Sequence, residues 1–258
     1  MNESKPGVSA LRIRCIAWRW VTKLWIVMLV GAMGTMAGCA ALGLGGINLI
    51  SVEEEWQLGR QIEQEIAQEM PVRQDSRISR IGNQMASQTE LSGRPWRFYV
   101  IEQDEVNAFN APGGLVYIYR GLINTVASEQ ELAGVIAHEV GHGAARHGTQ
   151  RLTRQYGISV LANVVLGGDP GILEEIVASL VAGGAMAQFS QQQEYEADRL
   201  GIRYLSRAGY DPRGLVSFFE TLIEMRERQP GTVEQFFATH PPTPDRIERA
   251  EAEIRRVN

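Results

Sequence analysis

Two histidines and a glutamate share a five-residue run, His138-Glu139-Val140-Gly141-His142. On an α-helix the two histidines lie about 40° apart around the axis, one turn above the other. Two such imidazoles can ligate one zinc ion, each at about 2.0–2.1 Å. Glu139 lies about 60° from His142, where it can act as general base on a water without ligating the metal. The run therefore predicts a zinc site that catalyses hydrolysis.

The helix that must carry this run is expected to begin at Ser128 and to continue to about His147. Ser128 and Glu131 have the spacing of a capping box. The apolar positions before the run predict a buried face, on which unpaired histidines would be costly: Leu132, Val135 and Ile136. The alternative is an ordinary helix that happens to carry two histidines. On a continuous helix His147 turns about 140° from the metal face, which predicts a structural role for it.

A catalytic zinc needs a third protein ligand and one open position. In the run Gln-Glu-Tyr-Glu-Ala-Asp-Arg at residues 193–199, Glu194 and Asp198 are four residues apart and share a helix face. One carboxylate can bind the metal while the other accepts the free N–H of a ligand histidine. The alternative is a solvated acidic face, with Arg199 and Arg203 as ion-pair partners. Spacing alone does not decide between the two.

The HEVGH run, followed some fifty residues later by EYEADRLG, resembles the family of zinc metallopeptidases that contains HtpX and the CAAX prenyl proteases. Residues 107–114 (NAFNAPGG) and 239–247 (THPPTPDRI) also resemble segments of that family, so the similarity covers the whole body of the chain. It is nearest to the small periplasmic lipoprotein members. The resemblance implies a zincin-like (gluzincin) fold, one zinc ion, Glu194 as third metal ligand and Asp198 as a partner of a ligand.

Three further features are candidates for the site. His240, outside the helix, could cover the open zinc position as a gate or stabilise the oxyanion, and Arg246 is a rival for the second role. A histidine in a surface turn is the alternative. The apolar segment 115–119 could be an edge strand that pairs with an extended substrate, or an ordinary core strand. The residues predicted to bind substrate this way are Gly114, Leu115, Val116 and Tyr117.

The remaining pattern predicts a mainly helical α+β fold with a small sheet inserted early. Strands are expected at residues 96–101 and 115–119. Helices are expected at residues 51–70, 77–89, 149–166, after Pro170, 186–208, 213–228 and 244–257. Residues 107–114 are expected to end in a turn.

The N-terminal region has the order of a secretory signal: basic residues, an apolar run, then small residues before Cys39. We expect residues 1–38 to be a lipoprotein signal peptide, Cys39 to be lipidated, 39–52 to be a lipid-anchored linker and 53–258 to be the metallopeptidase domain. Ala40 after the cysteine favours, by resemblance, the periplasmic side of the outer membrane. The uncharged run 24–50 leaves an uncleaved signal anchor in the inner membrane as the alternative.

The charge of the body restricts its partners. The formal net charge of the chain is -5, and beyond residue 38 there are 20 basic and 29 acidic residues. No basic stripe for phosphate backbones is visible, so nucleic acid is not expected as a partner. By resemblance, we expect an endopeptidase that degrades unfolded or misassembled membrane proteins of the bacterial cell envelope. The rival is a chaperone-like protein for outer-membrane protein assembly, with a latched, little-used site.

Overall fold

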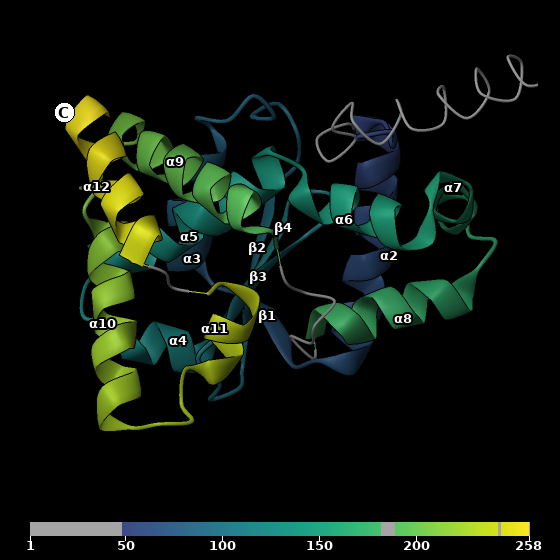
Figure 1. Cartoon of the computed structure of the whole chain (residues 1–258). Helices are drawn as coiled ribbons and strands as arrows, with labels where there is room; N and C mark the ends of the chain where they lie inside the picture. The colour runs from purple at the N-terminus through teal and green to yellow at the C-terminus, as the bar shows by residue number, and fades with distance from the viewer. Residues whose placement is uncertain (1–47, 182–188, 242–243, 258) are drawn as a thin grey trace, which may run out of the picture. The chain divides into compact units, whose positions relative to one another are not determined.

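The computed structural model describes residues 48–181, 189–241 and 244–257 (Figure 1). Contacts divide the chain into two units, Met1–Ile47 and Asn48–Asn258, and the described residues all belong to the second. The predicted signal peptide, Cys39 and most of the predicted linker lie outside the described residues. Within the described ranges, no helix combines the length and the apolar character that crossing a membrane requires.

The first half of the described chain contains all four strands of the described sheet. Its elements are α2 (Val52–Glu69), β1 (Val72–Gln74), α3 (Ser76–Ala86), β2 (Arg97–Ile101), β3 (Ala108–Ala111), β4 (Leu115–Tyr119) and α4 (Arg120–Thr125). The second half is helical: α5 (Glu129–Ala144), α6 (His147–Tyr156), α7 (Ile158–Val165), α8 (Pro170–Val181), α9 (Gln191–Arg207), α10 (Gly214–Arg228), α11 (Glu234–Thr239) and α12 (Pro244–Val257). The predicted mainly helical α+β class is confirmed.

Serine N-caps begin the three helices that build the centre of the fold. Ser51 and Ser190 each form a full capping box, at α2 and α9. Ser128 caps α5 by accepting from the N–H of Glu131 at 3.2 Å. The carboxylate of Glu131 accepts from the N–H of Ala127, one residue before the cap. Each cap satisfies a helix donor that would otherwise lack a partner.

The strand order is β1-β2-β4-β3, with β2 and β4 parallel and the other pairs antiparallel. β4 is therefore an inner strand, with β2 on one side and β3 on the other. The prediction that residues 115–119 form an edge strand is wrong, because both backbone edges of β4 are already paired. The predicted substrate-binding residues lie on or beside this inner strand and are buried: Gly114, Leu115, Val116 and Tyr117.

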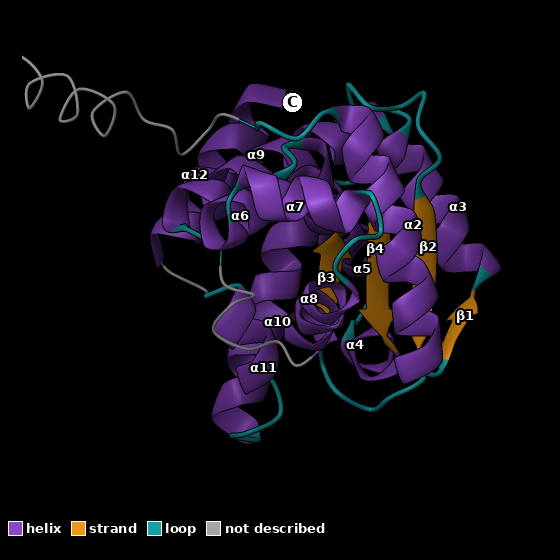
Figure 2. Cartoon of the chain, turned by 90° about the vertical axis from the view of Figure 1, so that its right-hand side faces the viewer, coloured by secondary structure: helices purple, strands orange, loops and turns teal. Residues whose placement is uncertain are grey.

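Each face of the sheet packs against its own helices (Figure 2). Along β4, Val116 and Ile118 enter the core that contains residues of α3, α5, α9 and α10. The intervening Leu115, Tyr117 and Tyr119 enter the core formed with α2, α7 and α8. Successive side chains of a strand point to opposite faces, so a strand buried on both faces reads as the continuous apolar run LVYIY. The helix α5, which carries the HEVGH run, thus lies against one face of the sheet.

Glycines allow α5 and α9 to approach closely where they cross. A Cβ on Gly141 of α5 would lie 2.6 Å from the carbonyl oxygen of Ala197. A Cβ on Gly201 of α9 would lie 3.0 Å from the backbone of Ala137. Both distances are too short for ordinary van der Waals contact. The crossing brings the HEVGH run against the carboxylates of α9, although the two segments are some fifty residues apart.

Candidate metal centre

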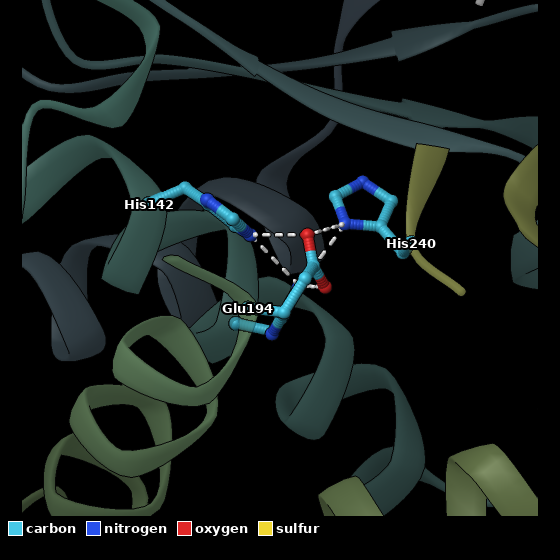
Figure 3. A group of neighbouring side chains, drawn as sticks. His142, Glu194 and His240 are labelled. Carbon is cyan, nitrogen blue, oxygen red and sulfur yellow. Dashed lines mark hydrogen bonds and ion pairs between the residues drawn. The ribbon is translucent and has the colours of Figure 1, made fainter. Parts of the chain in front are cut away.

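Three elements bring four metal-ligating side chains to one point. His138 and His142 come from α5, Glu194 from the first turn of α9, and His240 from the residue that ends α11. One donor atom from each side chain lies within 4.8 Å of all the others, and all four residues are buried. Figure 3 shows the carboxylate of Glu194 between the rings of His142 and His240.

Four of the distances among these donors are close to those between ligands of a zinc ion. Ligands at about 2.0–2.1 Å from a common centre are about 3.3–3.4 Å from one another. The Nε2 atoms of His138 and His142 are 3.1 Å apart, and Nε2 of His142 is 3.4 Å from Oε1 of Glu194. Nδ1 of His240 is 3.2 Å from both Nε2 of His138 and Oε1 of Glu194. Two or three imidazoles and one carboxylate are donors that zinc accepts.

Glu139 has the environment of a base rather than of a structural carboxylate. Its side chain is fully buried, and neither carboxylate oxygen has a hydrogen-bond partner among the described residues. Nε2 of His240, which is a cation only when the ring is protonated, lies 3.5 Å from Oε1 of Glu139. A buried carboxylate without such partners is costly in a protein interior. The arrangement is therefore suited to a polar ligand, such as a water or a substrate, next to the four donors.

Asp198 connects the metal donors to a buried arginine. Its Oδ1 lies 2.9 Å from Nδ1 of His138, the ring nitrogen that faces away from the other donors. Both carboxylate oxygens accept from Arg246 at 2.8 Å, which is bidentate pairing. Arg246 also contacts Oε2 of Glu194 at 2.8 Å and donates to the carbonyl of Pro241. The guanidinium thus holds two carboxylates of α9 in place.

Opposite charges in this cluster keep its buried carboxylates and its arginine ionised. Burial alone would raise the pKa of Glu194 and of Asp198, but nearby positive charge holds both below their usual range. For Glu194 the opposing charges come first from His240 and then from Arg246; for Asp198 the opposing charge is Arg246. Burial works against the charge of Arg246, yet Asp198 and Glu194 raise its pKa. Burial lowers the pKa of His142 well below its usual value, which keeps this ring neutral as a ligand must be.

His147 is positioned differently from the sequence-based prediction. α5 ends at Ala144, and Arg146 has a left-handed backbone (φ 58°) before α6 begins at His147. The angle expected on a continuous helix therefore does not apply. His147 stays outside the group of four donors, but its Nδ1 lies 3.0 Å from Nδ1 of His142. No pattern in the sequence predicts this contact, because it depends on the break between the two helices.

The edge of the sheet near the metal donors is β3, which lies in a segment where only a terminal turn is predicted. The N–H of Tyr119 donates to the carbonyl of Asn107 at 3.0 Å, so these two residues are a hydrogen-bonded pair of the ladder. Hydrogen-bonded and non-hydrogen-bonded pairs alternate along an antiparallel ladder. Ala108 and Asn110 belong to non-hydrogen-bonded pairs, so their main-chain N–H and C=O groups point away from β4. A small cavity lies between this strand and the centre, and its lining includes Asn107, Asn110, Phe189 and His240.

Comparisons with known proteins place these features in a family. The profile of peptidase family M48 matches residues 72–254. The chain is 31% identical to the beta-barrel assembly-enhancing protease of Escherichia coli (strain K12), over 81% of this chain and 44% of that protein. It is 33% identical to the mitochondrial metalloendopeptidase OMA1 of Arabidopsis thaliana, over 60% of this chain and 31% of that protein. It is 29% identical to the metalloprotease YcaL of Escherichia coli, over 67% of this chain and 70% of that protein.

The chain spans less than half the length of the first two of these relatives. The matched region nevertheless contains every residue of the metal centre described above, from the HEVGH run on α5 to Arg246 on α12. The predicted resemblance to the zinc metallopeptidases is confirmed: this chain belongs to peptidase family M48.

Proposed function

We propose that this chain is a zinc-dependent endopeptidase with a single metal ion. The observation that carries the proposal is the meeting of four buried donors beside a buried carboxylate that has no hydrogen-bond partner among the described residues. His138, His142 and Glu194 would hold the zinc, as the ligand set of a catalytic site requires. Zinc, when bound, supplies polarisation of the substrate carbonyl and a lowered pKa for water at the site, towards about 7.

The other residues of the centre have separate tasks in this proposal. Glu139 accepts a proton from the attacking water and delivers it to the leaving amine, so its free carboxylate oxygens are the reactive atoms. Asp198 orients the ring of His138 through Nδ1. Arg246, which is 1% exposed and bound to two carboxylates, orients Asp198 and Glu194. This task replaces the oxyanion role that the sequence suggested for Arg246.

His240 has a task that its position favours over oxyanion stabilisation. Its Nδ1 lies 3.2 Å from donor atoms of both His138 and Glu194, a distance typical of two ligands of one zinc ion. The ring therefore occupies the fourth ligand position, which a substrate carbonyl needs. We assign it the role of a gate that must swing away before a peptide carbonyl can enter. The same position favours the rival function, a binding protein whose site stays latched.

The substrates we propose are unfolded or misassembled envelope proteins. β3 is an edge strand of the described sheet, and the main-chain groups of Asn110 point away from β4, so an extended peptide can meet this edge by strand addition. Such pairing selects for unfolded conformation rather than for sequence. One relative is named for assembly of β-barrels, which supports substrates among outer-membrane proteins.

Metal removal tests the activity. The purified full chain is expected to contain about one zinc ion and to digest casein, an unfolded polypeptide, while a folded globular protein stays intact. A chelator should stop digestion, and added zinc should restore it, because two histidines and a carboxylate alone cannot polarise the carbonyl. Zinc content and fragment release are the measurements. Metal-free protein would contradict the proposal; zinc-bound protein that holds casein uncut would support the latched binding protein.

We further propose that Cys39 is lipidated after removal of residues 1–38, which would attach the domain to the periplasmic side of the outer membrane through the linker 39–52. Radioactive palmitate is expected to label the wild-type chain and the Cys15→Ala variant, because Cys15 would be removed with the signal peptide. The Cys39→Ala variant should stay unlabelled. Equal labelling of the Cys39→Ala variant would refute lipidation at this residue, and a wild-type chain without label would favour the uncleaved signal anchor.

A further inference from the structure

His147 lies directly behind one of the metal donors. It is the first residue of α6, and it is 1% exposed. Its ring meets the ring of His142 edge to face, with centroids 5.1 Å apart and an interplanar angle of 72°. The two Nδ1 atoms are 3.0 Å apart. The contact is therefore a hydrogen bond between the outer nitrogen of a metal donor and a second, buried imidazole.

The direction of this hydrogen bond follows from the arrangement of nitrogens. Nε2 of His142 faces Glu194 and His138, so it is the atom available to the metal and carries no proton. Nδ1 of His142 then carries the proton and donates to Nδ1 of His147. A neutral His147 that accepts at Nδ1 has its own proton on Nε2, and Nε2 lies 3.4 Å from Oε2 of Glu196. The three side chains form one chain of donors and acceptors.

The backbone around His147 is built to hold this orientation. Arg146 adopts its left-handed conformation while its guanidinium donates to the carbonyls of Ile50 and Ser51, at 2.6 and 3.0 Å. It also pairs with the buried carboxylate of Glu55. These contacts fix the break between α5 and α6, and the break is what turns His147 toward His142. Phe189 stacks on the ring of His142, with centroids 3.9 Å apart, and restricts its rotation.

We propose that His147, backed by Glu196, is a positioning residue that fixes the tautomer and ring orientation of His142 for zinc. The inference rests on the proposed zinc site. Each α5 histidine donor then has its own partner: Asp198 behind His138, and His147 behind His142. Partners of this kind typically account for about 10–100-fold in metal affinity. The alternative role for His147 is apolar packing alone.

A pair of variants separates hydrogen bonding from packing. In His147→Asn the amide oxygen can stand where Nδ1 stood and accept from His142, whereas His147→Leu fills similar space without an acceptor. Zinc affinity is measured on the full chain by competition with a chelator, and the thermal stability of the metal-free chains is measured alongside. We expect about 10–100-fold weaker zinc binding for His147→Leu and a change of less than about threefold for His147→Asn.

The outcomes keep this inference distinct from the proposed function. Wild-type chain that fails to bind zinc overturns both. Wild-type chain that binds zinc, with unchanged affinity in His147→Leu or an equal loss in both variants, overturns the inference alone. If His147→Leu does not fold, Glu196→Ala decides the question, since the Glu196 side chain is 47% exposed and its loss leaves the interior filled. A several-fold weaker zinc affinity is expected there, and unchanged affinity overturns the inference.

Discussion

A Glu139→Gln variant is expected to lose about 10²–10⁴-fold in the rate of casein digestion while retaining its zinc. Both carboxylate oxygens of Glu139 are buried and have no hydrogen-bond partner among the described residues. An amide of the same shape can occupy this space but cannot take a proton from water. Zinc content should stay unchanged, because Glu139 is not one of the four donors that come together. Digestion and zinc content are measured on the same preparation.

Glu131 provides the matched control for this experiment. It lies on the same helix, two turns earlier, and is also buried. Its carboxylate accepts from the N–H of Ala127 at 2.8 Å and from the hydroxyl of Thr221 at 3.2 Å, so its role is structural. Glu131→Gln should lower stability without lowering the digestion rate of the folded protein. Digestion by Glu139→Gln at the rate of this control would contradict Glu139 as the base.

The parts of the fold that local sequence determines could be predicted. The helix α5 begins after Ser128 as expected, since a capping residue and an apolar face are local features. The strand at residues 115–119 is confirmed residue for residue as β4. Its place in the sheet could not be predicted, because LVYIY is compatible with an edge strand and with an inner one. Strand order depends on pairing with β2 and β3, and pairing is a long-range property.

Short elements and helix breaks were missed for a similar reason. β3 has only four residues and β1 only three, so neither offers enough alternation to distinguish a strand from a turn. The helix expected at residues 149–166 is two helices, α6 and α7, separated at Gly157 with φ 78°. Glycine adopts this conformation at little cost. A single glycine within a helical pattern is also compatible with an unbroken helix, so the sequence does not predict the break.

The metal centre was more predictable than the network around it. Helix geometry places His138 and His142 on one helix face, and Glu194 and Asp198 on one face of another helix. The resemblance to the zinc metallopeptidases, rather than the spacing, predicts that Glu194 and Asp198 belong to the site. The bidentate pairing of Arg246 with Asp198 joins α12 to α9 across 48 residues, and no local pattern specifies it. The contact of His147 with His142 similarly required the left-handed residue between α5 and α6.

Arg246→Met is expected to lower the free energy of unfolding by about 3–5 kcal/mol. The variant leaves Asp198 and Glu194, each 2% exposed, without the cation that pairs with both. Desolvation of an unpaired carboxylate is the cost. Chemical denaturation of the full chain, with zinc and with a chelator, measures the effect. Zinc would offset part of the cost at Glu194 but not at Asp198, so a large loss should persist in both conditions.

Two companion variants and a change of pH identify the cause. Arg249→Met removes an exposed arginine on the same helix, paired with Asp245 at 3.6 Å, and should cost less than about 1 kcal/mol. Adding Asp198→Asn to Arg246→Met should recover stability, because the unpaired buried carboxylate is then replaced by a neutral amide.

In the wild type the pKa of Asp198 is lowered, so its contribution to stability is present at neutral pH and is lost as pH falls through that pKa. In Arg246→Met the shift of the Asp198 pKa on folding should reverse its direction. With the guanidinium gone, burial is no longer outweighed at Asp198, and its pKa should rise above the value in the unfolded chain. Protonation of the folded form then becomes favourable, so the stability deficit of the variant relative to wild type should shrink as pH falls from 7 towards about 4. A deficit that stays constant over this range, or that equals the loss in Arg249→Met, would show that the buried pair of Arg246 and Asp198 does not hold the centre together.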